Sequence, residues 1–368
     1  MTIQQKIVQS KQHDRANQEA LGSILRFSSR VIRETARDTF RASDEGKALT
    51  EEFAKPGADE RMEELVPRAV ALADSDNIYR LERFFQRYVA EEVMMRRIVY
   101  SESEREELLA RKAAPRNSAG GTLDIDPDFP MPDYFDGVEW HLMPGGWDGY
   151  DLYSAPSGGP QVNVYKYGGF AAVPSETNIW NHRVEVAQQL YKDQYDRILE
   201  IGCGPGMTLK FIHQVYPDAE LVGVDVSPSL LTVAHDNLER QGIKADLKQR
   251  DNRDTGEPDG SIDAIVSFAV HHEAPFQVNV DMFKEAFRVL KPGGDIVLHD
   301  PPPFRAVEPF HAAVLDWDTV HREEPFFSEA SYANWDKELA KIGFVKVESY
   351  PLGKDSYPWV TRAQKPAA

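Results

Sequence analysis

Cysteine is almost absent from this chain of 368 residues. The single cysteine, Cys203, excludes an intrachain disulfide and a cysteine-rich metal site. No stretch approaches the ~20 apolar residues that a membrane-spanning helix requires, and the N-terminus lacks the apolar core of a signal peptide. The sequence therefore predicts a soluble, cytoplasmic protein with no membrane partner.

Basic residues are the minority among the charged residues. Lys and Arg together number 42 against 60 Asp and Glu, which gives a formal net charge of −18 at pH 7. A protein that binds the phosphate backbone of a nucleic acid needs a basic surface. The charge balance therefore disfavours a nucleic-acid partner and favours a small molecule or another protein.

Glycine is scarce in the first 116 residues, where apolar residues recur at helical spacing between charged ones. The spacing predicts amphipathic helices within 21–32, 65–72 and 78–109, with a turn at Lys55-Pro-Gly. Two roles stay open for this N-terminal helical domain (1–116). It could be a packing or dimerisation domain, and dimerisation through its helices would make the protein a homodimer. Alternatively, one of its helices could close over an active site.

Residues 117–177 are rich in Gly, Pro and aromatic residues, which predicts a connecting region of loops and short strands. Residues 161–165 are one strand candidate. The aromatic side chains of this region and its border could form the wall of a substrate pocket or cover a hydrophobic edge. They are Trp140, Trp147, Tyr150, Tyr153 and Trp180.

From residue 178 to 368 strand patterns alternate with helix patterns, which is typical of an α/β fold with a parallel sheet covered by helices. Strands are predicted at 197–201, 220–225, 245–249, 262–268 and 295–299. Helices are predicted at 178–191, 207–215, 227–241 and 280–290.

The first of these strands runs into the loop 202–206, Gly-Cys-Gly-Pro-Gly, and Asp225 ends the second strand. Glycines let the backbone turn tightly and approach a ligand, and the following helix presents free N–H groups. A carboxylate at the end of the second strand is placed to accept both hydroxyls of a ribose. The pattern predicts a nucleotide cofactor. A dinucleotide fingerprint would need a small residue where Met207 stands, which disfavours a dinucleotide.

Residues 199–206, Leu-Glu-Ile-Gly-Cys-Gly-Pro-Gly, resemble motif I of the class I S-adenosylmethionine-dependent methyltransferases. Residues 222–227 resemble the second motif of that family, 249–252 the third, 261–272 the fourth and 287–295 the fifth. All five stand in family order, which makes chance a poor explanation. The chain is thus similar to the small-molecule methyltransferases of this class.

The resemblance implies a Rossmann-like, seven-stranded sheet in residues 178–368, whose last two strands form an antiparallel hairpin. Residues 344–350 and 359–364 suit these two strands, and a helix at 328–342 would precede them. The implied cofactor is S-adenosylmethionine, with S-adenosylhomocysteine as the product.

The resemblance also implies cofactor contacts. Glu200 would organise the glycine loop and the methionine end of the cofactor, Asp225 would hold the ribose, and Asp251 would contact the adenine amino group. Phe268 would lie beside the sulfonium. A helix cap remains the alternative for Asp225, and a turn for Asp251. The full set is Glu200, Gly202, Cys203, Gly204, Asp225, Val226, Asp251, Asn252 and Phe268.

His271 and His272 follow the fourth strand, at the carboxyl edge of the sheet where open α/β folds bind ligands. An imidazole at this edge could act as a general base on a hydroxyl or an amine, and capping of the next segment is the alternative. No metal is expected. Related metal-assisted enzymes carry Glu-x-x-Glu-His here, and alignment on His272 would need acids in place of Phe268 and His271.

The segment 299–327 is rich in apolar and aromatic residues and suggests a lid over a hydrophobic or aromatic acceptor. The leading hypothesis is metal-independent methylation of such a small molecule, at oxygen before nitrogen or carbon. The alternatives are a methyltransferase acting on a peptide or protein and a non-catalytic, cofactor-binding regulatory protein. The candidate acceptor contacts are Trp180, Arg183, His299, Phe304 and Trp317.

Overall fold

The computed structural model describes residues 12–113, 119–154, 164, 179–353 and 356–367. All of the strand candidate 161–165 except Val164 lies outside the described residues. Among the described helices, none is long and apolar enough to cross a membrane.

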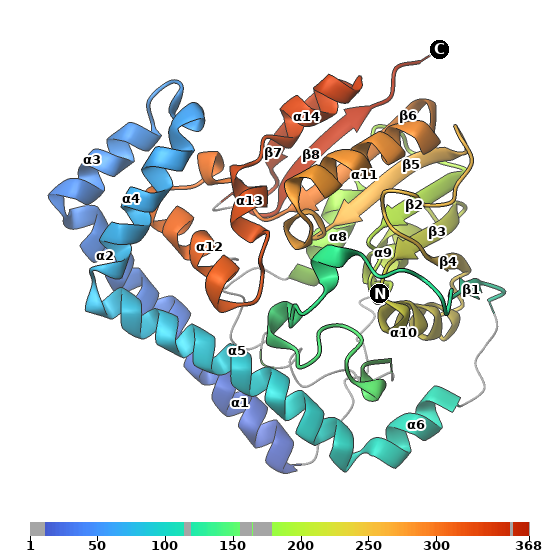
Figure 1. Ribbon diagram of the computed structural model, residues 1–368, viewed down its shortest axis with the longest axis horizontal. Helices are drawn as coiled ribbons and strands as arrows, with labels where there is room; N and C mark the ends of the chain where they lie inside the picture. The colour runs from blue at the N-terminus through green and yellow to red at the C-terminus, as the bar shows by residue number, and fades with distance from the viewer. Residues whose placement is uncertain (1–11, 114–118, 155–163, 165–178, 354–355, 368) are drawn as a thin grey trace.

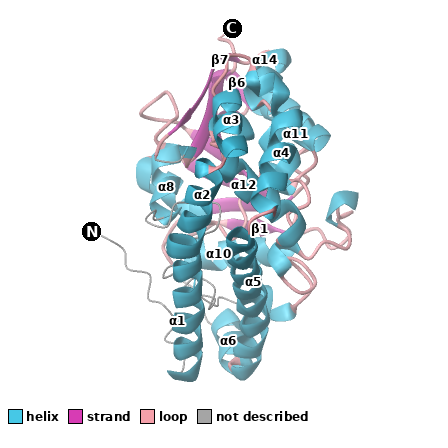
Figure 2. Ribbon diagram, turned by 90° about the vertical axis from the view of Figure 1, so that its left-hand side faces the viewer, coloured by secondary structure: helices cyan, strands magenta, loops and turns pink. Residues whose placement is uncertain are grey.

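The N-terminal residues form helices, as predicted. Side-chain caps define two of them: Gly46 N donates to Ser43 Oγ (3.0 Å), and Ile78 N donates to Asp76 Oδ1 (2.8 Å). α1 and α5 lie side by side and extend away from the sheet (Figures 1 and 2). The helices are α1 (Gln12–Phe27), α2 (Arg33–Ala42), α3 (Asp44–Phe53), α4 (Met62–Asp74), α5 (Asn77–Ser103) and α6 (Arg105–Ala113), with η1 (Ser28–Ile32) joining α1 to α2 and η2 (Ala58–Arg61) preceding α4.

The C-terminal part of the chain builds one mixed sheet in the order β1-β4-β3-β2-β5-β6-β8-β7. The pairings are parallel except those of β8, which runs antiparallel to β6 and to β7. The strands are β1 (Thr122–Asp124), β2 (Arg197–Ile201), β3 (Glu220–Asp225), β4 (Ala245–Gln249), β5 (Ile262–Phe268), β6 (Leu290–Asp300), β7 (Val345–Pro351) and β8 (Trp359–Gln364).

The sheet has eight strands rather than the predicted seven. The additional strand, β1, comes from the connecting region and pairs with β4 at the edge of the sheet. A strand of three residues is too short to show a periodic pattern, so its sequence carried no signal. The connecting region therefore joins the sheet through β1.

Helices cover both faces of the sheet, as the alternating pattern predicted. α8 (Ile179–Ala187), α9 (Met207–Val215) and α10 (Pro228–Glu239) bury one face, and α11 (Phe276–Val289) with α14 (Trp335–Ile342) buries the other. The helix predicted at 328–342 is two helices, α13 (Phe327–Tyr332) and α14. The chain is extended at Ala333, and Asn334 Oδ1 accepts from Lys337 N (3.2 Å) to start α14.

α12 (Pro309–His321) packs among the N-terminal helices although it follows β6 in the chain (Figure 1). Phe310 is 2% exposed and meets Phe40 and Tyr79 edge-on, each with a centroid distance of 5.6 Å. Tyr79 Oη donates to Ala313 O (3.1 Å). The two ends of the chain therefore share one core here. The domain boundaries predicted after residues 116 and 177 stay predictions.

We expect Phe310→Ala to lower the free energy of unfolding by about 3–5 kcal/mol, because it leaves a cavity between α2, α5 and α12. Chemical denaturation measures the change. Phe84→Ala is the control, since Phe84 is 62% exposed and its loss leaves no cavity. Similar losses in the two variants would contradict the shared core.

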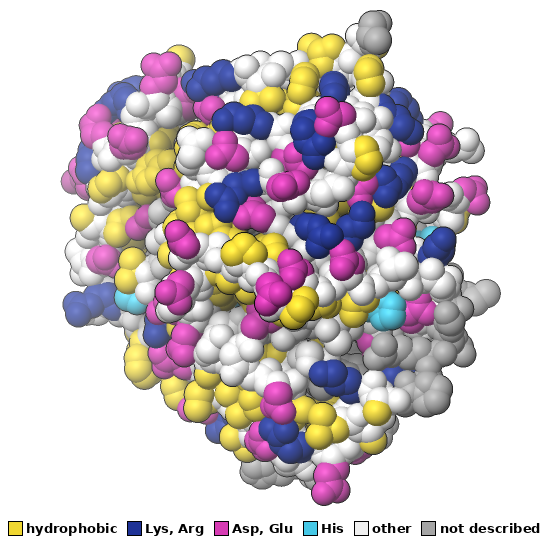
Figure 3. All heavy atoms as spheres, turned by 45° about the vertical axis from the view of Figure 1, so that its right-hand side comes forward, with side chains coloured by type: hydrophobic (Ala, Val, Ile, Leu, Met, Phe, Trp, Pro, Cys, Tyr) yellow, Lys and Arg dark blue, Asp and Glu magenta, His cyan; other side chains and the backbone are white. Residues whose placement is uncertain are grey.

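Charged side chains are mixed on the face shown in Figure 3. Among the described residues on this face, Lys and Arg lie interspersed with Asp and Glu rather than gathered into one basic area.

Candidate functional site

The glycine loop follows β2 directly. Gly202 has φ +65°, and a Cβ there would lie 2.5 Å from Val270 Cγ2, so the position needs glycine. Gly204 has φ +48°, and a Cβ there would meet nothing within 4 Å. The loop therefore leaves open space over Gly204 at the carboxyl edge of the sheet.

Asp225 ends β3 and supports this loop. Its Oδ2 accepts from Gly204 N (2.8 Å) and its Oδ1 from Ser227 N (2.9 Å). Burial raises the pKa of Asp225 to about 6, although both N–H bonds act to lower it. The side chain that caps α10 is Ser227, whose Oγ accepts from Leu230 N (3.1 Å). Each carboxylate oxygen of Asp225 keeps a lone pair for a further donor.

Glu200 is 1% exposed on β2. Burial raises the pKa of its carboxyl group to about 8, despite hydrogen bonds from Thr208 and from the backbone of Leu209 and the nearby charge of Arg183. Its Oε2 has no hydrogen-bond partner among the described residues. A buried polar atom without a partner is rare and indicates a place for a ligand.

At the end of β4, Asp251 closes a turn. Its Oδ1 accepts from Arg253 N and from Arg253 Nε, both at 2.9 Å. Asp251 therefore stabilises a turn, which was the alternative to adenine contact. The neighbouring Asn252 is 7% exposed, and its Oδ1 has no partner among the described residues. Asn252 is therefore better placed than Asp251 to meet a new donor. A surface cavity beside Asp251 is lined in part by residues 124–127 and 129 of the connecting region.

Val226 and Cys203 are both buried beside the loop. The carbonyl of Val226 accepts from Gln249 Nε2 (3.0 Å). Cys203 Sγ lies 2.9 Å from the position that a Cβ of Gly223 would take, and burial raises the pKa of its thiol well above the ordinary value. The cysteine therefore packs into the core through its side chain, and only its backbone belongs to the loop.

Phe268, at the end of β5, contacts two nitrogen-bearing side chains. The guanidinium of Arg183 lies 4.2 Å from its ring centroid, and so does the centroid of His299. His299 Nδ1 lies 3.0 Å from Trp359 O, and burial lowers the pKa of His299 to about 3, so the ring is neutral. The predicted positions of Phe268, Arg183 and His299 are thus brought together.

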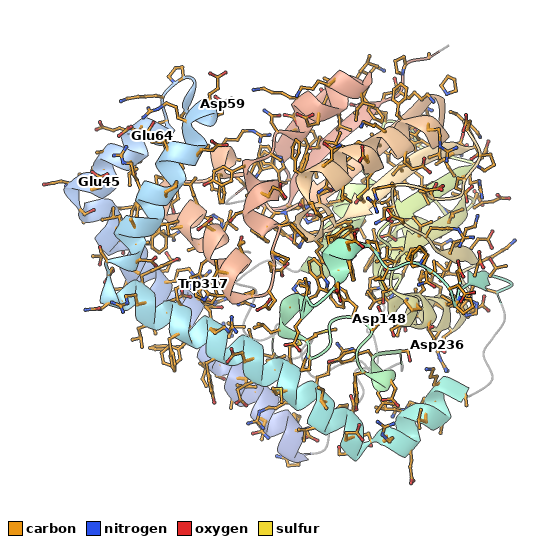
Figure 4. The ribbon with its side chains drawn as sticks, in the orientation of Figure 1. Glu45, Asp59, Glu64, Asp148, Asp236 and Trp317 are labelled. Atoms are coloured by element: carbon orange, nitrogen blue, oxygen red, sulfur yellow. The ribbon has the colours of Figure 1, made fainter. Side chains whose placement is uncertain are left out.

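Two of the other candidate acceptor contacts, Phe304 and Trp317, are not brought to this place. Phe304 is fully buried against Tyr332, in a cluster with α4. Trp317 lies on α12, and the guanidinium of Arg83 on α5 lies 4.8 Å from its ring. Figure 4 shows Trp317 apart from Asp148, a residue of the connecting region that accepts a hydrogen bond from Ser227 at the start of α10. Trp180 belongs to α8, and its side chain lies outside the described residues. The placement of Phe304 and Trp317 gives them packing roles and does not support contact with an acceptor.

His271 and His272 have different surroundings, although they are adjacent in the turn η6 (His271–Glu273). His271 is 1% exposed, its Nδ1 lies 2.6 Å from Asn279 Oδ1, and its ring packs on Phe283. Burial lowers the pKa of His271. Asn279 Nδ2 also donates to His271 O (2.8 Å). This is the capping alternative that the sequence left open for His271, and a catalytic role for it stays a prediction.

His272 lies at the acidic side of the turn. Its Nδ1 is 2.6 Å from Asp300 Oδ1 at the end of β6, and its Nε2 is 3.9 Å from both Glu273 Oε1 and Glu324 Oε2. Burial alone would lower the pKa of His272, but Asp300, with Glu324 and Glu273 farther away, raises it to about 9. The neutral ring is therefore a strong proton acceptor, although it is the minority form at pH 7.

His141, which the sequence analysis missed, joins this group from the connecting region. Its Nε2 lies 3.0 Å from Glu273 Oε1 and its Nδ1 lies 2.5 Å from Glu324 Oε1. Burial alone would lower its pKa, but the two carboxylates raise it well above the ordinary value. His141 adopts φ +54°, an uncommon conformation for a residue with a side chain. No local pattern marks His141 or Glu324, because they stand 183 positions apart (324 − 141).

Part of the site lies in a segment that resembles known proteins. Residues 198–294 match the family model described as a methyltransferase domain. Residues 198–294 form a class I S-adenosylmethionine-dependent methyltransferase domain. The match covers β2 to β6 of this domain, and so includes the glycine loop, Asp225, Asn252 and His272.

Curated relatives of the methyltransferase domain act on different compounds. The chain is 30% identical over 178 residues to erythromycin 3''-O-methyltransferase of Saccharopolyspora erythraea, covering 45% of this chain and 56% of the relative. It is 33% identical over 109 residues to demethylmenaquinone methyltransferase of Thermus thermophilus, covering 29% and 48%. The chain thus spans about half the length of the curated relatives that it matches.

Solved structures resemble the methyltransferase domain more distantly. Phosphoethanolamine N-methyltransferase 2 of Haemonchus contortus, in complex with S-adenosyl-L-methionine, aligns with a TM-score of 0.41 and 16% identity over 51% of this chain and 53% of that one.

The residues of the methyltransferase domain fit S-adenosylmethionine. This cofactor carries an ammonium and a sulfonium, two ribose hydroxyls and an adenine amino group, all of which seek acceptors or negative charge. The carboxylate of Asp225 beside Gly204 and the unpartnered Glu200 Oε2 and Asn252 Oδ1 are acceptors of the kind that these groups need.

Proposed function

We propose that this protein transfers the methyl group of S-adenosylmethionine to a small-molecule acceptor, with an oxygen as the favoured accepting atom. The observation that carries the proposal is the pair His272–Asp300 at the carboxyl edge of β5 and β6. The glycine loop and Asp225 lie at the same edge of the sheet, because β2, β3, β5 and β6 run parallel and all four segments follow or end these strands.

S-adenosylmethionine, when bound, supplies an activated methyl group. Transfer is an in-line displacement, in which the acceptor oxygen forms the new bond to carbon as the carbon–sulfur bond breaks. His272 Nε2 takes the proton of the acceptor hydroxyl. Asp300 Oδ1 keeps the Nδ1–H of the imidazole oriented and stabilises the imidazolium that forms, as an aspartate does in other histidine-based sites.

The relatives support a small acceptor. Their names specify erythromycin, demethylmenaquinone and, at 26% identity over 134 residues, trans-aconitate, all of which are small molecules. The first is methylated on oxygen, which agrees with a base at His272. Dimerisation through the N-terminal helices stays a prediction.

Calorimetry tests the cofactor half of the proposal. We expect S-adenosylmethionine to bind and NADH not to bind. Asp225→Asn should weaken S-adenosylmethionine binding by about 10–100-fold, because its amide N–H₂ would face the N–H of Gly204 or Ser227 and would offer the ribose one acceptor fewer. Asp218→Asn, at an exposed position before β3, is the matched control. Binding of NADH in place of S-adenosylmethionine would overturn the assignment.

A further inference from the structure

We propose that His141, Glu273 and Glu324 bind one divalent cation beside the acceptor position. The three side chains come from the connecting region, the turn after β5 and the segment between α12 and α13. Their candidate ligand atoms all lie within 4.8 Å of one another. The fold therefore brings three metal-binding side chains together from positions that are remote in the sequence.

The spacing suits an ion after a small movement. Ligands about 2.0–2.2 Å from a common ion lie at most about 4.4 Å apart. His141 Nε2 and Glu273 Oε1 are separated by 3.0 Å, and His141 Nδ1 and Glu324 Oε1 by 2.5 Å. One ring nitrogen would leave its present carboxylate contact and bind the ion instead.

Glu324 supplies an independent sign of a missing ligand. The side chain is 6% exposed, and its Oε2 has no hydrogen-bond partner among the described residues. An imidazolium of His141 bridging the two glutamates would satisfy Oε1 of Glu324, whereas Oε2 would face only His272 Nε2 at 3.9 Å, which is too far for a hydrogen bond. Because a buried carboxylate oxygen without a partner is costly, a cation at this place would stabilise it.

The charge around the site also favours a cation. The carboxylates of Glu273, Glu324 and Asp300 meet two imidazoles here, those of His141 and His272. A ligand set of one imidazole nitrogen and two carboxylate oxygens suits Mn²⁺ or Zn²⁺ better than Ca²⁺ or Mg²⁺, which prefer oxygen alone. The lack of acids at positions 268 and 271 predicted an enzyme without a metal. The proposed site departs from that prediction and uses residues at other positions.

The site has a consequence for the acceptor, which rests on the proposed function. Three protein ligands leave coordination positions open, as in catalytic metal sites. An acceptor with a hydroxyl beside a second oxygen, such as a vicinal diol or a hydroxy acid, would occupy two of them. Coordination would hold the hydroxyl near His272 and favour loss of its proton.

Titration with Mn²⁺ alone, followed by the electron paramagnetic resonance signal of the free ion, tests the site without cofactor or acceptor. We expect one Mn²⁺ to bind per chain. Glu324→Gln should weaken binding at least tenfold, whereas Glu323→Gln, the same change one position away, should leave it unaltered. Thermal unfolding shows whether each variant is folded. If Glu324→Gln is not folded, His141→Gln takes its place and should likewise weaken Mn²⁺ binding at least tenfold.

Absence of stoichiometric Mn²⁺ and Zn²⁺ binding by the unaltered protein, or equal affinity in Glu324→Gln and Glu323→Gln, would overturn the cation site. The proposed function fails by a different result, namely no binding of S-adenosylmethionine. The two proposals are therefore tested separately.

Discussion

His272→Ala is expected to lower kcat by about 10²–10⁴-fold and to leave the affinity for S-adenosylmethionine nearly unchanged. The imidazole is oriented by Asp300 at 2.6 Å and touches none of the residues assigned to the ribose or the adenine. Transfer of a labelled methyl group to an acceptor of the unaltered protein measures kcat, and calorimetry measures the affinity.

Two further variants make this result specific. Asp300→Asn should give a smaller loss of kcat than His272→Ala, because an amide oxygen still accepts from Nδ1 but stabilises the imidazolium less. His321→Ala, at an exposed position on α12, should leave kcat unchanged. If His272→Ala abolishes cofactor binding instead, His272 is structural and the base assignment is wrong.

Binding of S-adenosylmethionine is expected to release a proton from Glu200. With a pKa of about 8 in the free protein, Glu200 is mainly protonated at pH 7. The positive groups of the cofactor favour the carboxylate and lower this pKa in the complex. Affinity should therefore rise by up to about tenfold per pH unit below pH 8 and level off above it.

Calorimetry at pH 7 in phosphate and in Tris measures this release, because the two buffers take up a proton with different heats. Glu200→Gln should remove the difference between the buffers and the pH dependence, and should weaken binding about 10–100-fold. Glu220→Gln, at the exposed start of β3, is the control and should behave as the unaltered protein. Equal binding heats in both buffers for the unaltered protein would contradict the assignment.

Much of the cofactor domain could be predicted from local patterns. α9 and strands β2 to β5 have the predicted bounds, and β8 was placed residue for residue. These elements alternate apolar segments with glycine turns or capped helices, so each carries its own signal. The glycine loop and Asp225 could also be located from the sequence, because a strand, a tight turn and an acid at the end of the next strand stand close together in the chain.

The acceptor side could not be predicted in the same way. Sequence alone could not separate His271 from His272, since both follow the same strand. The turn η6 directs one ring to Phe283 and Asn279 in the core and the other to Asp300. Likewise, apolar residues of α12 read as a lid, but the helix packs against α4 and α5.

The sequence by itself determined the α/β class, the cofactor loop and the acids that serve it, because these depend on residues close together in the chain. Only the tertiary structure decided that β1 extends the sheet and that His141 meets Glu273 and Glu324. The physical reason is distance along the chain. Contacts between segments more than a hundred residues apart depend on how whole layers pack, and no local periodicity records that packing.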